Sequence, residues 1–345
     1  DGNYELLFGG DAGYADTDIE IWNATADDTY GQVWATTLDD EIYAVAVGDQ
    51  DSDTYFEAIV GSDLGTLAVY ENTREYMVEY RVVWQSDVLP GISAEWIRDM
   101  VAVDVDNDTI LEVFAVGVDS YVYGFKYTGV GDNNYTLLAP YYLGMQGYSL
   151  AAADIDVDGY PEVLVGAEDG LYILKYNSTT GELELMYNFT TGEEVWGLCA
   201  GDLNNDSIPE VIFNGYYIVY ACTWNETAHA LEQLWNYSTY YSVYSLACGD
   251  LDQDGLPEVF VGEYYYLVVL NASGAQEASH SYGYYKYVVD IAMPDTYKNH
   301  VEDIDKDGKL EAAVVVQESY APDYVYLVEA TGPNSYAFEA WSCSY

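Results

Sequence analysis

The sequence predicts an all-β fold, a seven-bladed β-propeller of four-stranded antiparallel blades in which the first blade lacks its innermost strand. Three observations carry this prediction. An acidic nine-residue motif recurs six times, an apolar β-branched run follows each copy, and each repeat contains four short strand patterns. Successive motifs begin 55, 50, 48, 48 and 53 residues apart, a spacing typical of a radial or stacked repeat. We therefore expect a single domain that spans residues 1–345.

The motif is clearest at residues 154–162, which read DIDVDGYPE and precede the apolar run VLVG. Acidic side chains stand at positions 1, 3, 5 and 9, and the glycine at position 6 suits a sharp turn. With the carbonyl of position 7, the loop offers the hard oxygen ligands that Ca²⁺ requires, as in the first half of an EF-hand. Because an apolar β-branched run follows, the loop leads into a strand and not a helix.

All six copies are predicted to bind Ca²⁺ through the side chains of positions 1, 3, 5 and 9 and the carbonyl of position 7. The predicted ligands are Asp49, Asp51, Asp53, Tyr55 and Glu57; Asp104, Asp106, Asp108, Ile110 and Glu112; Asp154, Asp156, Asp158, Tyr160 and Glu162; Asp202, Asn204, Asp206, Ile208 and Glu210; Asp250, Asp252, Asp254, Leu256 and Glu258; and Asp303, Asp305, Asp307, Lys309 and Glu311.

Some copies depart from the pattern. Thr54, Thr109 and Ser207 replace the turn glycine, so in these three loops we expect weaker binding or an altered turn. Asn204 replaces an aspartate, which removes a charge but keeps an oxygen. Whether the loops with Thr54, Thr109 and Ser207 hold metal stays open at this point.

The strand patterns divide the chain into blades. In the repeat at 145–192 we expect strands at 148–153, 162–166, 171–176 and 182–188, with the motif between the first two. The same count gives a partial first blade at 1–38 and six blades at about 39–92, 93–144, 145–192, 193–239, 240–284 and 285–345.

The first blade lacks its innermost strand because Asp1-Gly2-Asn3-Tyr4-Glu5 matches only positions 5 to 9 of a seventh motif. Two explanations stay open: the strand lies upstream of Asp1 in a longer precursor, or a neighbouring molecule donates it. Donation would complete the sheet and the seventh metal site, and it would link molecules into a polymer.

Charge excludes several classes of partner. The chain carries 60 acidic and 9 basic residues, a net charge of −51 that disfavours binding to nucleic acid or to an anionic membrane surface. No apolar run approaches the roughly 18 residues of a transmembrane helix. No signal peptide is present, so we expect the chain to be processed or incomplete. The strong acidity and the 39 tyrosines favour an exported protein from a hot, acidic or salty habitat.

Asn-x-Ser/Thr triplets favour an extracellular location. The sequence contains nine such triplets, whereas its composition predicts about two by chance. Those at Asn107 and Asn205 lie inside metal loops and are taken as accidental. We predict glycosylation at the other seven, Asn23, Asn134, Asn177, Asn188, Asn225, Asn236 and Asn271. The four cysteines, Cys199, Cys222, Cys248 and Cys343, show no CxxC spacing, and their pairing is left open.

An aromatic residue recurs six positions before the first loop aspartate. It is present as Tyr43, Tyr148, Trp196 and Tyr244, and Arg98 takes its place in one repeat. Such a ring can stack on a glycan or peptide at a channel mouth, or it can fill the wedge between blades. Wedge packing is the favoured interpretation. An insertion at 294–302 lengthens one loop, and long loops on a rigid scaffold are frequent binding sites.

The motif D-x-D-x-D-G-x-x-E, followed by an apolar strand and glycine at a period of about 50, resembles the FG-GAP/VCBS-type repeat of integrin α-subunit heads and secreted microbial propellers. The resemblance covers essentially the whole chain. It implies a seven-bladed propeller with Ca²⁺ between the first and second strands of each blade, used mainly for adhesion and surface display.

The preferred function is a non-enzymatic, calcium-stabilised structural or adhesion protein of the cell surface, with a homopolymer or another surface protein as its partner. No catalytic residues are predicted, because His229, His280 and His300 lie in different repeats without Cys or His partners at ligand spacing. One alternative is a glycan-binding module. The other is an acidic-polysaccharide lyase, for which Arg98, Lys298 and His300 are the only candidate groups.

Overall fold

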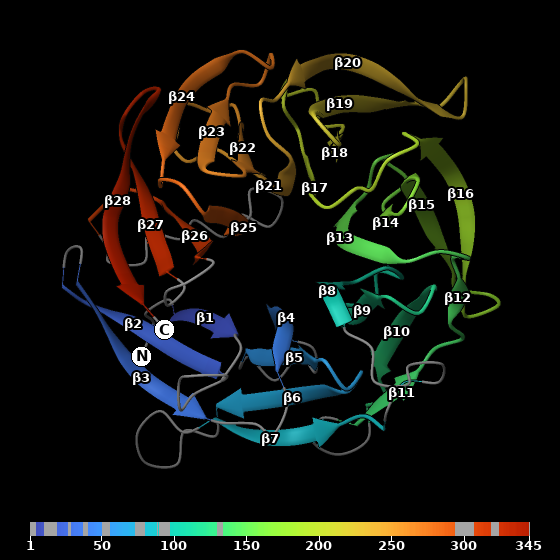
Figure 1. Cartoon of the computed structure of the whole chain (residues 1–345). Helices are drawn as coiled ribbons and strands as arrows, with labels where there is room; N and C mark the ends of the chain where they lie inside the picture. The colour runs from blue at the N-terminus through green and yellow to red at the C-terminus, as the bar shows by residue number, and fades with distance from the viewer. Residues whose placement is uncertain are drawn as a thin grey trace.

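The computed structural model describes residues 5–9, 19–26, 29–36, 41–49, 56–72, 80–87, 89, 97–129, 134–293, 307–318 and 324–344. The regular secondary structure of these residues is entirely β-strand, and the sheets follow one another in sequence order around a ring (Figure 1). Nowhere in these ranges is there a helix of the length and apolar character that crossing a membrane requires.

Seven antiparallel sheets make up the ring. One has three strands, β1 (Glu5–Gly9), β2 (Ile19–Ala26) and β3 (Thr29–Thr36). The next contain β4 (Ile42–Gly48), β5 (Glu57–Ser62), β6 (Leu67–Asn72) and β7 (Tyr80–Gln85), and then β8 (Ile97–Val103), β9 (Glu112–Gly117), β10 (Tyr121–Tyr127), β11 (Tyr135–Leu137) and β12 (Tyr141–Tyr142).

Four further sheets complete the described ring. They contain β13 (Gly147–Ala153), β14 (Glu162–Ala167), β15 (Gly170–Asn177) and β16 (Glu182–Thr190); β17 (Leu198–Gly201), β18 (Glu210–Gly215), β19 (Ile218–Asn225) and β20 (Ala230–Ser238); β21 (Val243–Gly249), β22 (Glu258–Glu263), β23 (Tyr266–Leu270) and β24 (Gln276–Ser281); and β25 (Lys286–Ala292), β26 (Glu311–Glu318), β27 (Tyr324–Gly332) and β28 (Ser335–Ser344). The protein is therefore an all-β propeller of antiparallel four-stranded blades.

Six sheets have four or more strands, so the described residues form six complete blades, whereas the sequence predicts seven blades of which the first lacks its innermost strand. The seventh sheet, β1–β2–β3, has three strands among the described residues, with β1 at one edge and paired with β2.

The second strand of each blade is buried along its whole length, which explains its continuous apolar sequence. All six residues are buried in each of β9, β14, β18 and β22. The outermost strands are largely solvated instead: β16 and β20 each contain one buried residue among exposed and half-buried ones. Each blade therefore has a dry centre and a solvated outer edge.

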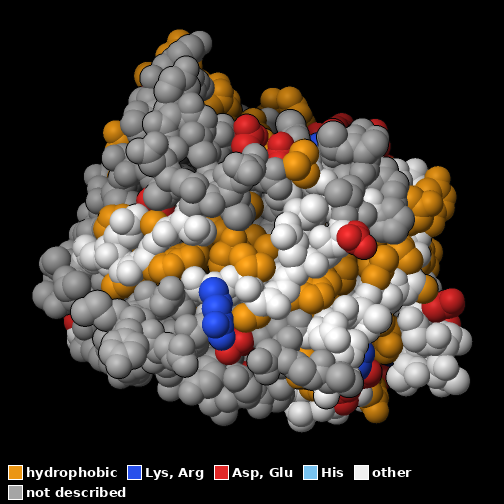
Figure 2. Space-filling view, turned by 90° about the horizontal axis from the view of Figure 1, so that it is seen from below, with side chains coloured by type: hydrophobic (Ala, Val, Ile, Leu, Met, Phe, Trp, Pro, Cys, Tyr) orange, Lys and Arg blue, Asp and Glu red, His pale blue; other side chains and the backbone are white. Residues whose placement is uncertain are grey.

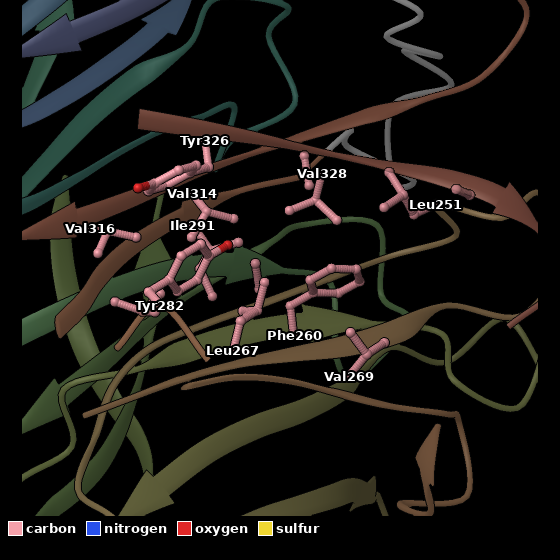
Figure 3. Packing of buried hydrophobic residues seen from close by; sticks show 14 of the residues in the cluster. Leu251, Phe260, Leu267, Val269, Tyr282, Ile291, Val314, Val316, Tyr326 and Val328 are labelled. Carbon is pink, nitrogen blue, oxygen red and sulfur yellow. The ribbon is translucent and has the colours of Figure 1, made fainter. Parts of the chain in front are cut away.

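The hydrophobic core lies between blades. One cluster joins Leu164 and Ile173 of one sheet to Val211 and Phe213 of the next. Another joins the last two sheets, with Phe260 and Leu267 on one side and Val314, Val316, Tyr326 and Val328 on the other (Figure 3). Each blade is therefore stabilised mainly by the apolar surface that it buries against its neighbours.

The glycine near the end of the second strand permits this close contact. A Cβ on Gly262 would lie 2.8 Å from Cγ1 and 2.9 Å from the carbonyl oxygen of Val288 in the next blade. A Cβ on Gly166 would overlap Ser149 Oγ and the carbonyl oxygen of Val195. These glycines leave room for Val288 of β25 and for Val195, just before β17, to approach.

A buried carboxyl stands at the end of β22. Glu263 is 2% exposed, and burial raises its pKa to about 7 although a hydrogen bond to the Tyr241 backbone lowers it. A carboxyl whose pKa is higher in the folded than in the unfolded state favours folding at low pH and loses that contribution as pH rises through the folded value.

The outer surface is mixed in character. The side shown in Figure 2 presents hydrophobic side chains among uncharged groups, with scattered acidic residues and few basic ones. Tyr142, Tyr240 and Tyr284 are exposed to 64, 87 and 81%.

We predict that Gly166→Ala lowers the free energy of unfolding by roughly 2 kcal/mol, because the methyl group must displace backbone as well as side chain. Thermal unfolding of the purified variant measures this effect. Glu168→Ala, at an exposed position two residues away, is the control and should unfold near the wild-type temperature. Equal melting of both variants would contradict the proposed close packing.

A second prediction concerns pH. Between pH 5 and pH 8 the ionisation of Glu263 should cost on the order of 2 kcal/mol of stability. Glu263→Gln removes the titrating group, so the variant should match the wild type at pH 5 and exceed it at pH 8. Denaturant unfolding at the two pH values measures this difference, and parallel pH dependences would show that Glu263 does not titrate in this range.

Candidate metal sites

Four acidic loops are described completely. They connect the first and second strands of their blades at residues 104–112, 154–162, 202–210 and 250–258, and we name each by its first residue, as in the Asp154 loop. The residue at position 2 is apolar and buried to 1% exposure in all four: Val105, Ile155, Leu203 and Leu251. Each loop is thus anchored in the core by the residue between its first two acids.

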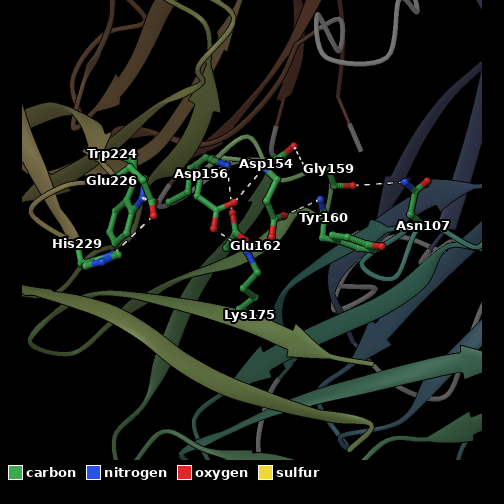
Figure 4. A network of polar contacts seen from close by, with 12 residues as sticks. Asn107, Asp154, Asp156, Gly159, Tyr160, Glu162, Lys175, Trp224, Glu226 and His229 are labelled. Atoms are coloured by element: carbon green, nitrogen blue, oxygen red, sulfur yellow. Dashed lines mark hydrogen bonds and ion pairs between the residues drawn. The ribbon is translucent and has the colours of Figure 1, made fainter. Parts of the chain in front are cut away.

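Backbone amides donate to both oxygens of the position-1 aspartate and to one oxygen each of the position-5 aspartate and the position-9 glutamate. In the Asp154 loop, Asp154 accepts bonds from the amides of Asp158 and Gly159 at 3.0 and 2.8 Å (Figure 4). The amide of Ile155 donates to Oε2 of Glu162 at 3.1 Å. The same bonds recur in the other three loops, which leaves the second oxygen of the position-9 glutamate pointing toward the other acids.

The turn is left-handed at two positions. At position 6, φ is 93° for Gly159 and 94° for Gly255, and also 75° for Thr109 and 69° for Ser207. The two replacements therefore keep the turn, and the expected alteration is not found in these loops; Thr54 lies outside the described residues. Position 4 is left-handed as well, which the sequence analysis missed.

The residues at position 4 differ in how well they tolerate the left-handed conformation. Asn107, Val157, Asn205 and Gln253 have φ values of 58, 57, 60 and 60°. Asparagine tolerates this conformation, which explains the two triplets inside loops, whereas a β-branched valine is strained there. The Asn107 side chain also donates to the Gly159 carbonyl of the next loop at 3.5 Å.

The Asp250 loop brings all four of its carboxylates together. One oxygen from each of Asp250, Asp252, Asp254 and Glu258 lies within 4.8 Å of the others. Oxygens that ligate one Ca²⁺ at about 2.3–2.6 Å lie at most about 5 Å apart, so this group fits a single ion.

The other loops bring fewer acids together. Three carboxylates converge in the Asp104 loop, from Asp104, Asp106 and Asp108, and three in the Asp154 loop, from Asp154, Asp156 and Glu162. The Asp202 loop shows no such group in its described residues, and there the Asn204 amide nitrogen donates to Oε1 of Glu210 at 2.9 Å. Asn204 thus turns its nitrogen, and not its oxygen, toward the glutamate.

Two lysines, which the sequence analysis did not single out as site residues, point into the loops. In the Asp154 loop, Nζ of Lys175 lies 2.6 Å from Asp156, 2.8 Å from Asp158 and 2.9 Å from Glu162. Partial burial lowers the pKa of Lys175, but the three carboxylates outweigh this effect and raise it above its ordinary value.

The same arrangement occurs one blade earlier. Nζ of Lys126 lies 2.7, 2.9 and 2.8 Å from Asp106, Asp108 and Glu112. Both lysines come from the third strand of the blade, opposite the position-9 glutamate.

That third-strand position varies from blade to blade. It holds Glu71, Lys126, Lys175, Thr223, Asn271 and Glu329 in chain order, as the strand registers show. These residues are identified by the register between the second and third strands. The nine-residue motif alone does not reveal this register.

Burial of the position-9 glutamates affects their charge. Burial, together with the charges of Asp252 and Asp250, raises the pKa of Glu258 to about 8. In Glu162 burial raises the pKa to about 7 against the lowering effect of Lys175. A bound cation would stabilise the ionised form of each of these groups.

The first and last loops are only partly described. Asp49, Glu57, Asp307, Lys309 and Glu311 lie within the described residues, whereas Asp51, Asp53, Tyr55, Asp303 and Asp305 lie outside them. Lys309 pairs with Asp307 at 2.7 Å and also with Glu329.

The position-7 residues of the four completely described loops bond to the position-5 aspartates through their backbone amides. The donors are the amides of Ile110, Tyr160, Ile208 and Leu256.

The predicted glycosylation sites lie at two kinds of position. Asn134, Asn188 and Asn236 are exposed on or beside outer strands. Asn177 and Asn225 close the turn between the third and fourth strands, where their amide nitrogens donate to Glu184 and Glu232. Asn271 accepts from the amides of Ser273 and Ala275 in the corresponding turn. The side chain of Asn23 lies outside the described residues.

The recurrent aromatics occupy β-bulges at the opposite end of the first strand. The register skips Tyr43, Arg98, Tyr148 and Tyr244 in their sheets, and a bulge re-aims the side chain of the skipped residue. Trp196 lies just before β17.

These side chains contact one another between blades. The ring centroids of Tyr148 and Trp196 are 4.3 Å apart, and those of Trp196 and Tyr244 are 6.5 Å apart. The Arg98 guanidinium carbon lies 4.2 Å from the Tyr148 centroid and 5.1 Å from that of Trp196. We call Tyr148, Trp196 and Tyr244 the aromatic arc. Arg98 packs against this arc as a cation over the rings of Tyr148 and Trp196.

The remaining candidate groups do not form a shared site within the described chain. His229 is near Glu226, and His280 stacks on Phe338, while Lys298 and His300 lie outside the described residues. Cys199, Cys222 and Cys248 are free thiols, of which the first two are buried. The side chain of Cys343 is outside the described residues.

The strain at position 4 gives a testable prediction. Val157→Asn should raise the free energy of unfolding by about 1 kcal/mol, because asparagine tolerates the left-handed conformation. The reverse change one loop earlier, Asn107→Val, should lower it by a similar amount. Unfolding in chelator, on unglycosylated protein, separates this effect from metal affinity. Opposite signs are expected, and a stabilising Asn107→Val would contradict the explanation.

Comparisons with known proteins agree with the propeller fold. Two solved structures of BBS1N in complex with ARL6DN, one soaked with mercury and one with lead, superpose with a TM-score of 0.64 at 14% identity. The match covers 92% of this chain and 86% of that chain. Sqt1 of Chaetomium thermophilum superposes with a TM-score of 0.62 at 13% identity, over 98% of this chain and 87% of that chain. At these identities the likeness shows the fold alone.

Sequence comparison is more selective. No match is found among the curated proteins. Residues 104–165 and 154–213 match the family described as FG-GAP-like repeat, and these segments contain the Asp104, Asp154 and Asp202 loops. The chain is a β-propeller that contains FG-GAP-like repeats within residues 104–213.

Proposed function

We propose that this chain is a non-enzymatic, calcium-stabilised propeller that serves as a structural or adhesion protein at the cell surface. The observation that carries the proposal is the convergence of four carboxylates in the Asp250 loop, within 4.8 Å of one another. Such a group repels itself unless a cation is present, and hard oxygen ligands at this spacing suit Ca²⁺.

Calcium would act by joining strands. The Asp250 loop lies between β21 and β22, and Glu258 is the first residue of the buried β22. An ion held by Glu258 and by the aspartates before it would fix the end of one strand to the start of the next. The ion would therefore stabilise the blade and not catalyse a reaction.

The extracellular assignment rests on the triplets and the charge. Asn134, Asn188 and Asn236 are exposed, so a glycan at these positions meets no packed core. A net charge of −51 keeps molecules apart in solution and suits an environment rich in cations. The same charge supports a partner other than nucleic acid.

Two observations support a partner protein or a second copy. The sheet of β1, β2 and β3 would become a seventh four-stranded blade if a strand added to β1, and a strand donated by another copy would link molecules into a polymer. The BBS1N propeller is solved in complex with ARL6DN, a precedent for a propeller of this fold that binds a protein.

A glycan-binding module is the second candidate function. The observation that favours it is the aromatic arc, in which the half-buried Trp196 and Tyr244 follow the buried Tyr148 across three blades. Aromatic faces of this kind stack on sugar rings. An acidic-polysaccharide lyase is disfavoured because Arg98 is engaged with Tyr148 and Trp196.

Calcium removal tests the main proposal. Chelation should lower Tm at neutral pH, and returning Ca²⁺ should restore it; an ion at 100 times its Kd adds about 2.7 kcal/mol per site. Differential scanning calorimetry measures the change, and elemental analysis of protein purified without chelator counts the ion.

The control is Asp254→Asn, which keeps the oxygen that accepts from the Leu256 amide but removes a ligand charge. This variant should respond less to Ca²⁺ than the wild type. A wild-type Tm that is indifferent to chelation, together with calcium-free purified protein, would show that the loops are ordinary acidic turns.

A further inference from the structure

Lys126 and Lys175 occupy the place where a metal would bind. Each Nζ lies 2.6–2.9 Å from three carboxylate oxygens, one at each of loop positions 3, 5 and 9. The equivalent oxygen atoms are contacted in both loops. In Asp108, Asp158, Glu112 and Glu162, the other carboxylate oxygen already accepts a hydrogen bond from a backbone amide. The ammonium therefore sits at the common focus of the free carboxylate oxygens.

We propose that Lys126 and Lys175 are built-in cations that replace the metal in the Asp104 and Asp154 loops, so that among the completely described loops metal binding is concentrated in the Asp250 loop. This inference rests on the calcium-binding function proposed above. It makes metal occupancy a property of the third strand of each blade and not of the acidic motif alone.

The two kinds of cation exclude one another for electrostatic and steric reasons. A Ca²⁺ at about 2.3–2.6 Å from the same oxygens would fall on or beside the ammonium. Two positive charges this close repel strongly where water is partly excluded. The lysine is also tethered to its blade, so it competes at a high effective concentration.

The Asp250 loop has the same acids without the lysine. Asn271 stands opposite Glu258, and its side-chain oxygen accepts from Ser273 and Ala275 in the adjoining turn. Among the described residues, no lysine lies between its four carboxylates, which thus face one another. In the Asp202 loop, Thr223 takes this place and the Asn204 amide donates to Glu210, an intermediate case with a neutral donor.

Equilibrium dialysis with Ca²⁺ and thermal unfolding of single-residue variants test the proposal on the full chain. Lys126→Met and Lys175→Met remove the ammonium and keep an unbranched side chain. Lys286→Met is the matched control, because Lys286 pairs with Glu318 away from the loops. Since two loops are only partly described, the measured quantity is the difference in bound Ca²⁺ between each variant and the wild type.

In chelator, each loop-lysine variant should show a larger loss of Tm than Lys286→Met. With Ca²⁺ added, each should bind one equivalent more than the wild type and recover its Tm, whereas Lys286→Met should gain none. In the wild-type background, Asp254→Asn should remove one equivalent and Asp156→Asn should remove none.

Contrary outcomes separate this proposal from the calcium function. If Asp156→Asn removes an equivalent from the wild type, or if the lysine variants gain none while Asp254→Asn still removes one, the lysines do not replace the metal and calcium binding stands. If no variant and no wild-type protein binds Ca²⁺, the calcium function fails and the replacement proposal fails with it.

Discussion

Repulsion between carboxylates at the edge of a dry core governs this structure. The position-9 glutamate begins a strand that is buried along its whole length, and Glu112, Glu162 and Glu210 are themselves fully buried. In the Asp154 and Asp250 loops, aspartates of the same loop converge on it. Taking such charges out of water is unfavourable unless an opposite charge or a strong donor compensates, so each loop needs a compensating group.

The blades meet this need in different ways. Two supply a lysine and one supplies an amide from Asn204, whereas the Asp250 loop presents four acids with no lysine of the described residues among them. The repeated motif therefore fixes the geometry of the turn and the anchoring of the glutamate, while the residue opposite that glutamate sets the charge. A chain with so few basic residues places two of its nine at these positions.

Much of the blade could be predicted because burial and turn chemistry leave clear local patterns. In residues 145–192 the four expected strands are β13 to β16, with ends that shift by no more than two residues. The loop acids follow from spacing alone. The partners of those acids could not be predicted in the same way, because they depend on the register between strands, and a slip of one residue moves a side chain to the other face.

Asn271 illustrates this limit. In sequence it resembles the turn residues Asn177 and Asn225, but its strand is shorter, and Asn271 stands opposite Glu258 where Lys175 stands opposite Glu162. The bulges that re-aim Tyr43, Tyr148 and Tyr244 were likewise hidden, since an extra residue in one strand leaves no mark in composition or periodicity.

The placement of the core between sheets has a consequence for how such a chain gains or loses length. Each blade presents one apolar face to the blade before it and another to the blade after it, as Phe213 and Leu164 do at one junction. Removing a whole repeat brings together two apolar blade faces that are not in contact in the intact ring. The ring closes again only if each of these faces can replace the one that was removed. Junctions with distinct shapes, such as the one where Val195 approaches Gly166, thus resist the deletion or shuffling of single repeats and keep the ring at one size.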